Sequence, residues 1–204
     1  MLLVVHFAER KGIGPEDSKR AMLDRRLSSM EIEKKYLIKE LPDLSQFRSH
    51  EIEQGYLTRR PVLRIRKRDD EYIFTYKSKV KGATEALNVN DELERPLTKE
   101  AYESLRKKTE GYLIHKTRYL IPFEAEYKGG NSEFAGGCCP NELLIELDVF
   151  HDRLEGLMFA EVEFPSEEAA LQFVPPKWLG KDVSGDRRYS NGYLSELEKY
   201  EMYE

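Results

Sequence analysis

The sequence predicts a mainly β (α+β) protein in which antiparallel strands close into a barrel and a few helices lie at its periphery. Three observations lead to this fold class. From Met30 onward, apolar and polar residues alternate with a period of two, in runs separated by short polar turns. Charged residues share one face of most runs, because side chains two positions apart in a strand point the same way. Acids dominate that face in some runs and bases in others, and a closed barrel with a polar interior would bring the two signs together.

Eight runs with strand character follow one another along the chain, and each is rich in β-branched or aromatic residues or alternates clearly. Short polar segments such as Asp69-Asp70 join most of them, as expected for antiparallel neighbours. The predicted strands are residues 30–38, 51–58, 62–68, 71–78, 87–94, 112–121, 143–150 and 158–164.

Three segments carry helix signals instead. Residues 98–108 have Thr98 as an N-cap candidate, lysines in the last turn and Gly111 beyond the end. A second helix is expected from Ser166, where two glutamates fall in the first turn. A third is expected near Asn191, where apolar residues recur at helical spacing. These segments are short, so the strands determine the fold class.

The chain divides into a leader, residues 1–29, and one domain, residues 30–204. The leader has a short apolar start and then a polar run, and the strand periodicity begins only at Met30. Met30 is therefore either the original start of the protein, or the first strand residue after an ordinary flexible or helical leader. Within the domain, the glycine-rich residues 124–142 predict a long surface loop.

Composition argues against several classes of protein. The 33 basic and 38 acidic residues leave a net charge of −5, whereas a protein that coats DNA is usually basic, so nucleic acid is not an expected partner. No apolar run approaches the roughly 20 residues that a membrane-spanning helix needs. The two cysteines, Cys138 and Cys139, are adjacent, which suits neither a disulfide framework nor a zinc ribbon. We therefore expect a cytoplasmic protein without a membrane partner, and a homodimer stays open.

Acidic residues share a face in four of the predicted strands, and basic residues do so in three others. A solvated face of an open sheet explains any one of these strands. Like charges two residues apart repel each other, however, so the segregation by sign requires countercharges from elsewhere. The acids are Glu31 and Glu33, Glu92 and Glu94, Glu146 and Asp148, and Glu161 and Glu163, and the bases are Arg64, Arg66 and Arg68, Lys77, and Lys116 with Arg118.

Inside a barrel, such acids would converge on a divalent cation and such bases on an anion. Carboxylates without a cysteine or histidine cluster suit Mg²⁺ or Mn²⁺, not zinc. An anion that needs several arginines and lysines at once indicates a polyphosphate, because guanidinium groups bind phosphate oxygens in pairs. The charge pattern thus points to a site for a polyphosphate and a hard metal ion.

Seven short motifs occur in order along the predicted strands and the closing segment. The first is ExExK, from Glu31 to Lys35, which is too short to be specific by itself. It is followed by Arg64-x-Arg66, TYK at 75–77, KTRY at 116–119, ELDVF at 146–150, AEVEF at 160–164 and WLGKDVSGDRRYSN at 178–191. Over about residues 30–195, this series resembles bacterial members of the CYTH, or triphosphate tunnel metalloenzyme, family. The leader and the long loop depart from the family pattern.

The resemblance implies an eight-stranded antiparallel tunnel, open at both ends, that hydrolyses a triphosphate with Mg²⁺ or Mn²⁺. It also implies roles for the residues that match the motifs. The implied metal ligands are Glu31, Glu33, Asp148, Glu161 and Glu163. The implied triphosphate-binding residues are Lys35, Arg64, Arg66, Lys77, Lys116 and Arg118, joined from the closing segment by Arg187 or Lys181. The expected catalytic residues are Lys35, Glu33 and Glu94, with Glu92 as the alternative to Glu94.

The family includes inorganic triphosphatases, thiamine triphosphatases and class IV adenylate cyclases, which differ in what they bind beyond the triphosphate. No residues here form a recognisable adenine site, so we expect inorganic tripolyphosphate as the substrate. A cyclase, or a thiamine or nucleoside triphosphatase, is the alternative among enzymes. A polyphosphate or RNA 5′-end binder without turnover is the alternative of another class. The many acids argue against it, since a binder needs cations more than it needs metal ligands.

Overall fold

The computed structural model describes residues 29–79, 88–123 and 143–201, with side chains for residues 32–78, 92–123 and 143–201. The predicted leader lies almost wholly outside these residues, and the predicted long loop with its two cysteines lies outside them too. The division into a leader and one domain therefore stays a prediction. In the described part of the chain, no helix is long and apolar enough to cross a membrane.

The fold is mainly β, as predicted, and the described residues form nine strands in one antiparallel sheet. Eight of the strands match the predicted runs to within three residues at each end. The sequence analysis missed the ninth, because four residues, LGKD, are too few to show a period of two. The strands are β1 (Ser29–Ile38), β2 (Arg48–Arg59), β3 (Val62–Arg68), β4 (Glu71–Lys79), β5 (Asn88–Pro96), β6 (Glu110–Pro122), β7 (Leu144–Phe150), β8 (Met158–Phe164) and β9 (Leu179–Asp182).

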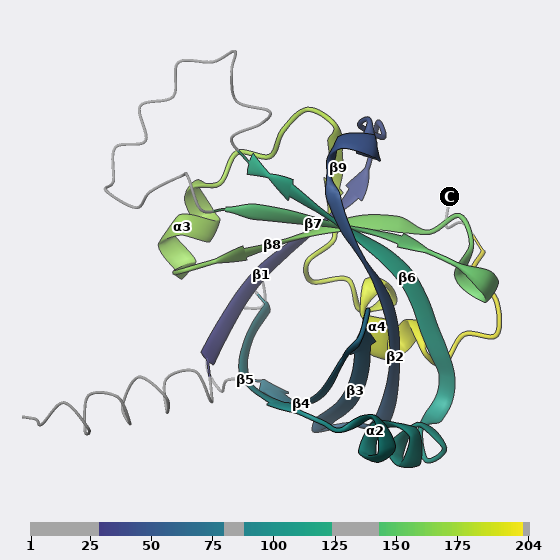
Figure 1. Ribbon diagram of the computed structural model, residues 1–204. Coiled ribbons are helices and arrows are strands. Elements are labelled where there is room, and N and C mark those ends of the chain that lie inside the picture. The colour runs from purple at the N-terminus through teal and green to yellow at the C-terminus, as the bar shows by residue number, and fades with distance from the viewer. Residues whose placement is uncertain (1–28, 80–87, 124–142, 202–204) are drawn as a thin grey trace, which may run out of the picture.

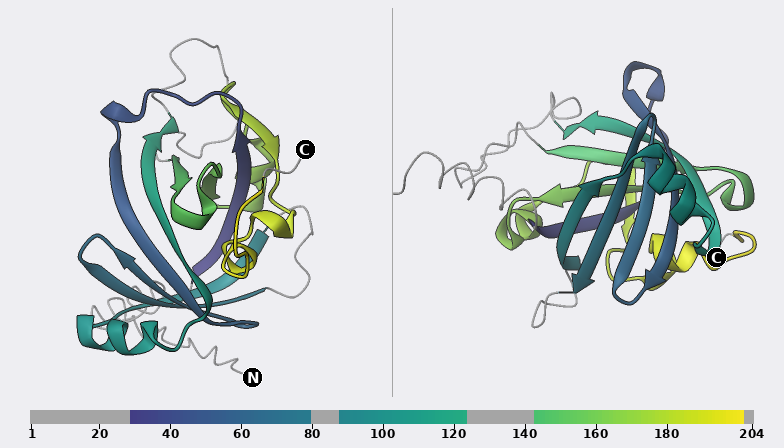
Figure 2. Two further views of the ribbon diagram at one scale, coloured as in Figure 1. Left: turned by 90° about the vertical axis from the view of Figure 1, so that its right-hand side faces the viewer. Right: turned by 60° about the horizontal axis from the view of Figure 1, so that its bottom comes forward.

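The strands pair in the order β5-β4-β3-β2-β6-β7-β8-β1-β9, and β5 also pairs with β1. In these pairings Lys35 of β1 lies opposite Glu161 of β8, and Glu33 of β1 lies opposite Asn88 of β5. The strands curl around a common axis, with β2, β3, β4 and β5 on one side and β7, β8 and β1 on the other (Figures 1 and 2). Full closure into an eight-stranded barrel stays a prediction, which the β5–β1 pairing supports.

Capping residues place the helices where the sequence predicted them. α2 (Lys99–Arg106) begins after Thr98, whose hydroxyl accepts a hydrogen bond from the backbone N–H of Ala101 at 3.2 Å. α3 (Glu167–Gln172) begins in the same way after Ser166. The remaining helical elements are a single turn each: α4 (Asn191–Leu194), η1 (Leu44–Gln46), η4 (Asp152–Leu154) and η5 (Arg187–Tyr189).

Two groups of buried apolar side chains stabilise the sheet. The outer core packs one face of β1, β7 and β8, including Ile32 and Leu147, against α3 and Trp178. The end core packs the opposite face of the strands against the C-terminal segment. Since Phe159 is two residues from Glu161 in β8, the end core borders the charged residues described below. The end core consists of Tyr56, Ile114, Phe150, Leu154, Leu157, Phe159, Val183, Tyr189 and Leu194.

Candidate active site

One face of the sheet carries most of the charged residues predicted for the site. We call it the inner face, and Lys35, Arg64, Arg118, Asp148 and Glu161 lie on it. The strand register brings opposite charges together there, because Arg118 of β6 lies opposite Asp148 of β7 and Lys35 lies opposite Glu161. Side chains directly opposite each other on neighbouring strands are close enough to interact. Acids and bases from several strands therefore meet on this face.

The paired half of the inner face is formed by β1, β6, β7 and β8. Asp148 is fully buried, and it accepts hydrogen bonds from Nε and Nη2 of Arg118, both at 2.7 Å. Lys116 also donates to Asp148, while Arg118 donates to Glu146 and, at 2.5 Å, to Glu161. Burial by itself lowers the pKa of Arg118, but Asp148 and Glu146 outweigh burial and raise that pKa well above its usual value. The protein itself neutralises the charges in this half.

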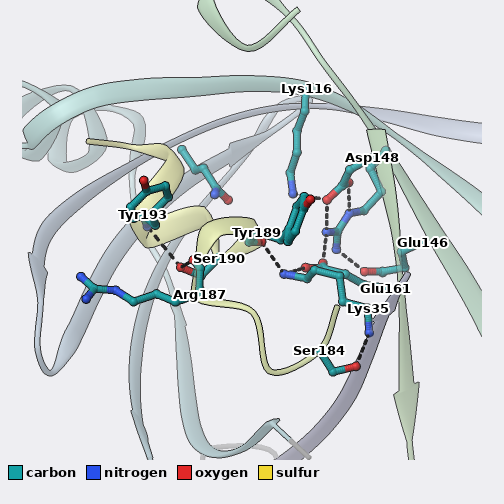
Figure 3. Close-up of polar contacts among 12 residues, drawn as sticks. Lys35, Lys116, Glu146, Asp148, Glu161, Ser184, Arg187, Tyr189, Ser190 and Tyr193 are labelled. Atoms are coloured by element: carbon teal, nitrogen blue, oxygen red, sulfur yellow. Dashed lines mark hydrogen bonds and ion pairs between the residues drawn. The ribbon is translucent and has the colours of Figure 1, made fainter. Parts of the chain in front are cut away.

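Lys35 belongs to the paired half and is held from two directions. Its Nζ forms an ion pair with Glu161 at 2.8 Å and donates to the backbone carbonyl oxygen of Tyr189 at 3.0 Å (Figure 3). Its backbone N–H donates to Ser184 Oγ at 3.0 Å. Burial lowers the pKa of Lys35, but the carboxylates of Glu161 and Glu33 more than compensate, so the pKa is raised. Lys35 is therefore a charged group whose position the C-terminal segment helps to set.

The cation-rich half of the inner face is formed by β3, β4 and β5. Arg64 Nη2 donates to Glu92 Oε1 at 3.2 Å, and Lys77 Nζ lies 3.5 Å from Glu92 Oε2. Arg66 forms no hydrogen bond or ion pair with the described part of the chain, and its Nε is buried. Burial, followed by repulsion from Arg64 and Arg118, lowers the pKa of Arg66 to about 10. Arg66 is thus a partly buried cation near other cations, without a bonded countercharge among the described residues.

β5 places both candidate acids, Glu92 and Glu94, on the inner face. The Glu92 side chain is 11 % exposed because Arg64 and Lys77 cover it. The Glu94 side chain is 45 % exposed, lies 3.7 Å from Arg64 and accepts a hydrogen bond from Thr75 at 3.2 Å. The assignment of a catalytic role to Glu94 stays a prediction, and its exposure makes it the more accessible of the two acids.

The predicted metal ligands are unevenly distributed. Glu33, Asp148 and Glu161 are buried, whereas Glu163, opposite Glu33 on β8, is exposed and lines an open cavity of about 340 Å³. Among the residues that the structure describes, no three Asp, Glu, His or Cys side chains are grouped to hold a metal ion. Asp148 and Glu161 are bound to lysine and arginine instead. The donors are nevertheless carboxylates, the ligand type that suits Mg²⁺ and Mn²⁺.

Three other candidates lie apart from these contacts. The side chain of Glu31 is outside the described residues, although its backbone belongs to β1. Arg187 of η5 is exposed and points away from the Lys35–Glu161 pair (Figure 3), because Tyr189 is the residue of that turn that faces inward. Lys181 of β9 is exposed as well. The described contacts therefore connect neither Arg187 nor Lys181 to the paired half.

The sequence analysis missed the neutral residues of the inner face. Gln54 and Tyr56 of β2 are 0 % and 3 % exposed, and they lie opposite Arg66 and Arg64 respectively. The charge pattern of the strands does not reveal them, because both side chains are neutral. The available signal was weaker: Gln54 is an amide on the same strand face as Ile52 and Tyr56, and that face is buried.

A second network of charged residues lies on the outer face of the sheet. Glu53 accepts hydrogen bonds from Arg106 Nε at 2.8 Å, Arg106 Nη2 at 2.9 Å and Tyr102 Oη at 2.8 Å, and it also contacts His115. The pKa of Glu53 is lowered to about 2, mainly by the hydrogen bonds that Arg106 donates to its carboxylate. Since Arg106 and Tyr102 belong to α2, the network attaches that helix to β2 and β6.

The fold and the inner face together define a class: a curled antiparallel sheet that opposes carboxylates with lysines and arginines, as expected for a CYTH domain. No protein-family model matches the chain. The chain is 37 % identical over 169 residues to an inorganic triphosphatase of Nitrosomonas europaea, an alignment that covers 81 % of this chain and 96 % of that protein. It is 32 % identical over 167 residues to an inorganic triphosphatase of Acetivibrio thermocellus, with coverage of 80 % and 92 %.

A solved structure of an inorganic triphosphatase is similar as well. It is 35 % identical in sequence, has a TM-score of 0.55, and the alignment covers 84 % of this chain and 98 % of that one. The protein belongs to the inorganic triphosphatase family of CYTH proteins, which confirms the resemblance found in the sequence.

Proposed function

We propose that the protein is a metal-dependent triphosphatase that hydrolyses inorganic tripolyphosphate on the inner face of a closed barrel. The observation that carries this proposal is the cation-rich half, where Arg66 is partly buried near Arg64 and has no bonded countercharge in the described part of the chain. A multiply charged anion would supply that countercharge. Two relatives named inorganic triphosphatase support the choice of substrate.

Six cations of the inner face would share the oxygens of the anion, and each arginine could donate up to two hydrogen bonds. They are Lys35, Arg64, Arg66, Lys77, Lys116 and Arg118. Arg64, Arg66 and Lys77 would bind the anion with little rearrangement. Lys116 and Arg118 would first exchange a carboxylate partner for a phosphate oxygen, which leaves Asp148 short of countercharge. The carboxylate of Asp148 would then be available to a divalent cation, so we expect anion and metal to bind in a coupled way.

The expected metal ligands are Glu31, Glu33, Asp148, Glu161 and Glu163, whose carboxylates suit Mg²⁺ or Mn²⁺. When bound, such an ion neutralises part of the charge on the phosphate oxygens. Lys35, charged and held by Glu161 and Tyr189, would stabilise the charge that develops on the transferred phosphoryl group. Glu94, the more exposed acid of β5, and Glu33 would position and deprotonate the attacking water.

Phosphate release from tripolyphosphate, ATP and thiamine triphosphate tests the proposal, with Mg²⁺, with Mn²⁺ and with EDTA. We expect tripolyphosphate to be hydrolysed fastest and EDTA to abolish the reaction. Cyclic AMP and pyrophosphate as the main products from ATP would instead identify a cyclase. Tight binding of tripolyphosphate without phosphate release in either metal would identify a binding protein.

A further inference from the structure

The side-chain amide of Gln54 has almost no partner among the residues that the structure describes. Gln54 is 0 % exposed on β2, between Arg66 of β3 and Ile114 of β6. Its Oε1 accepts no hydrogen bond from the described part of the chain, and its Nε2 has one long contact, 3.5 Å, to the hydroxyl of Tyr56. A buried amide without partners is unfavourable compared with an apolar side chain of the same size. A ligand with a hydrogen-bonding group at this position would satisfy the amide.

Arg66, directly opposite Gln54, is in the same situation. Its Nε is buried and has no hydrogen-bond partner among the described residues, and opposed residues of neighbouring antiparallel strands have Cβ atoms about 4.5–5.5 Å apart. Two unsatisfied polar groups on adjacent strands thus face the same part of the inner face. The surroundings are positive, because Arg64 and Arg66 are the main charged groups that counteract the effect of burial on the pKa of Tyr56.

The orientation of the amide decides which partner fits. The oxygen and nitrogen ends of a glutamine amide have similar shapes, and the hydrogen-bond network decides between them. If the amide is turned, the Tyr56 hydroxyl donates to Oε1, and Nε2 takes the position that has no partner in the described part of the chain, on the residue opposite Arg66. A neutral donor next to a guanidinium group is a suitable pair of ligands for one phosphate group.

We propose that Gln54 and Arg66 form a single anion subsite, in which the Gln54 amide donates a hydrogen bond to a phosphate oxygen. The occupant is an inorganic polyphosphate, and in this respect the proposal rests on the proposed function. The subsite is the innermost polar position along β2, because Tyr56 and Ile114, next to Gln54, already belong to the end core. Gln54 is then a substrate-binding residue that carries no charge.

Steady-state kinetics with tripolyphosphate and Mg²⁺ test the subsite in the full-length protein. Gln54→Met keeps the length of the side chain and removes both polar groups. We expect its KM to rise about tenfold, the cost of one hydrogen bond to a charged group, with kcat within about threefold of the wild type. Its melting temperature is expected to be unchanged or higher, because no unsatisfied amide remains buried. Gln172→Met, on the exposed end of α3, is the matched control and is expected to change neither value.

Three results would overturn the subsite. An unchanged KM in Gln54→Met, with a lowered melting temperature, would make the role of Gln54 structural. If Tyr56→Phe gives the same loss and the double variant adds nothing to it, Gln54 acts only through Tyr56. If the wild type does not hydrolyse tripolyphosphate at all, the proposed function fails. Calorimetric binding of tripolyphosphate with Mg²⁺ then decides the subsite separately, and equal affinity of wild type and Gln54→Met would overturn it.

Discussion

The paired half and the cation-rich half of the inner face contain the same types of charge, yet they satisfy them differently. In the paired half, buried Asp148 accepts from both Lys116 and Arg118, and Arg118 reaches two more carboxylates. In the cation-rich half, Glu92 is shared by Arg64 and Lys77, and Arg66 has no bonded partner in the described chain. One half is complete without a ligand, and the other is not.

This difference assigns the two halves different roles in the folded protein. A buried ion pair is costly to break, because the remaining charge stays desolvated. A buried cation without a partner reduces stability, and such a group is typical of a binding site. We therefore expect substitutions in the paired half to lower stability in addition to activity, and substitutions in the cation-rich half to act mainly on substrate affinity.

Removal of Asp148 is expected to have the largest effect. Asp148→Ala leaves Lys116 and Arg118 with fewer countercharges in a buried position, so the free energy of unfolding should fall by about 3–5 kcal/mol. Urea denaturation at neutral pH measures this. Asp70→Ala, an exposed acid in the turn between β3 and β4, is the control and should change stability little. Equal losses in the two variants would contradict the role of the paired half.

Substitution of one arginine in each half sharpens the comparison. Arg66→Met removes a partly buried cation that has no bonded partner among the described residues, so it should keep or increase stability while KM for tripolyphosphate rises about ten- to a hundredfold. Arg118→Met removes the partner of three carboxylates, so it should lower the free energy of unfolding by about 3 kcal/mol or more. Denaturation and kinetics on both variants separate the two effects. If Arg66→Met had a lower free energy of unfolding than Arg118→Met, the described difference between the two halves would be wrong.

The outer network around Glu53 is a reference with no expected link to the substrate. The folded-state pKa of Glu53, about 2, lies below the usual 4.5. The stabilising contribution of the Glu53 carboxylate is therefore fully present above pH 4.5 and is lost as the pH falls toward 2. After allowance for the partial exposure of Arg106, this contribution is on the order of 2 kcal/mol. The stability of Glu53→Gln should therefore fall less steeply over this pH range than that of the wild type. KM at neutral pH should stay unchanged, and a raised KM would connect the network to the site.

Much of the fold was predictable because strands with one charged face show a strong period of two. β3 and β8 agree with the predicted bounds at both ends. The caps at Thr98 and Ser166 were readable for a similar reason, since they depend only on residues a few positions apart. β9 was not readable, because its pairing with β1 is a long-range contact and its sequence is too short to alternate.

The site was predictable in its composition and not in its contacts. The alternation in β6 and β7 indicates that Arg118 and Asp148 each belong to a charged face. Only the antiparallel register of the two strands places them directly opposite each other. Glu163, by contrast, follows the same alternation as Glu161 and yet is exposed, because its position lies nearer the end of β8. Burial depends on what covers a residue, and a strand pattern does not contain that information.

The sequence by itself determined the mainly β fold, the limits of most strands, the charged faces and the family, because all of these rest on local spacing or on ordered motifs. The tertiary structure decided which charges neutralise each other and which do not. Register between distant strands sets these pairings, and the packing of the C-terminal segment brings the Tyr189 carbonyl to Lys35. The tertiary structure also decided that the neutral Gln54 lies buried opposite Arg66. The sequence does not show this, because only the surroundings distinguish a desolvated amide from an exposed one.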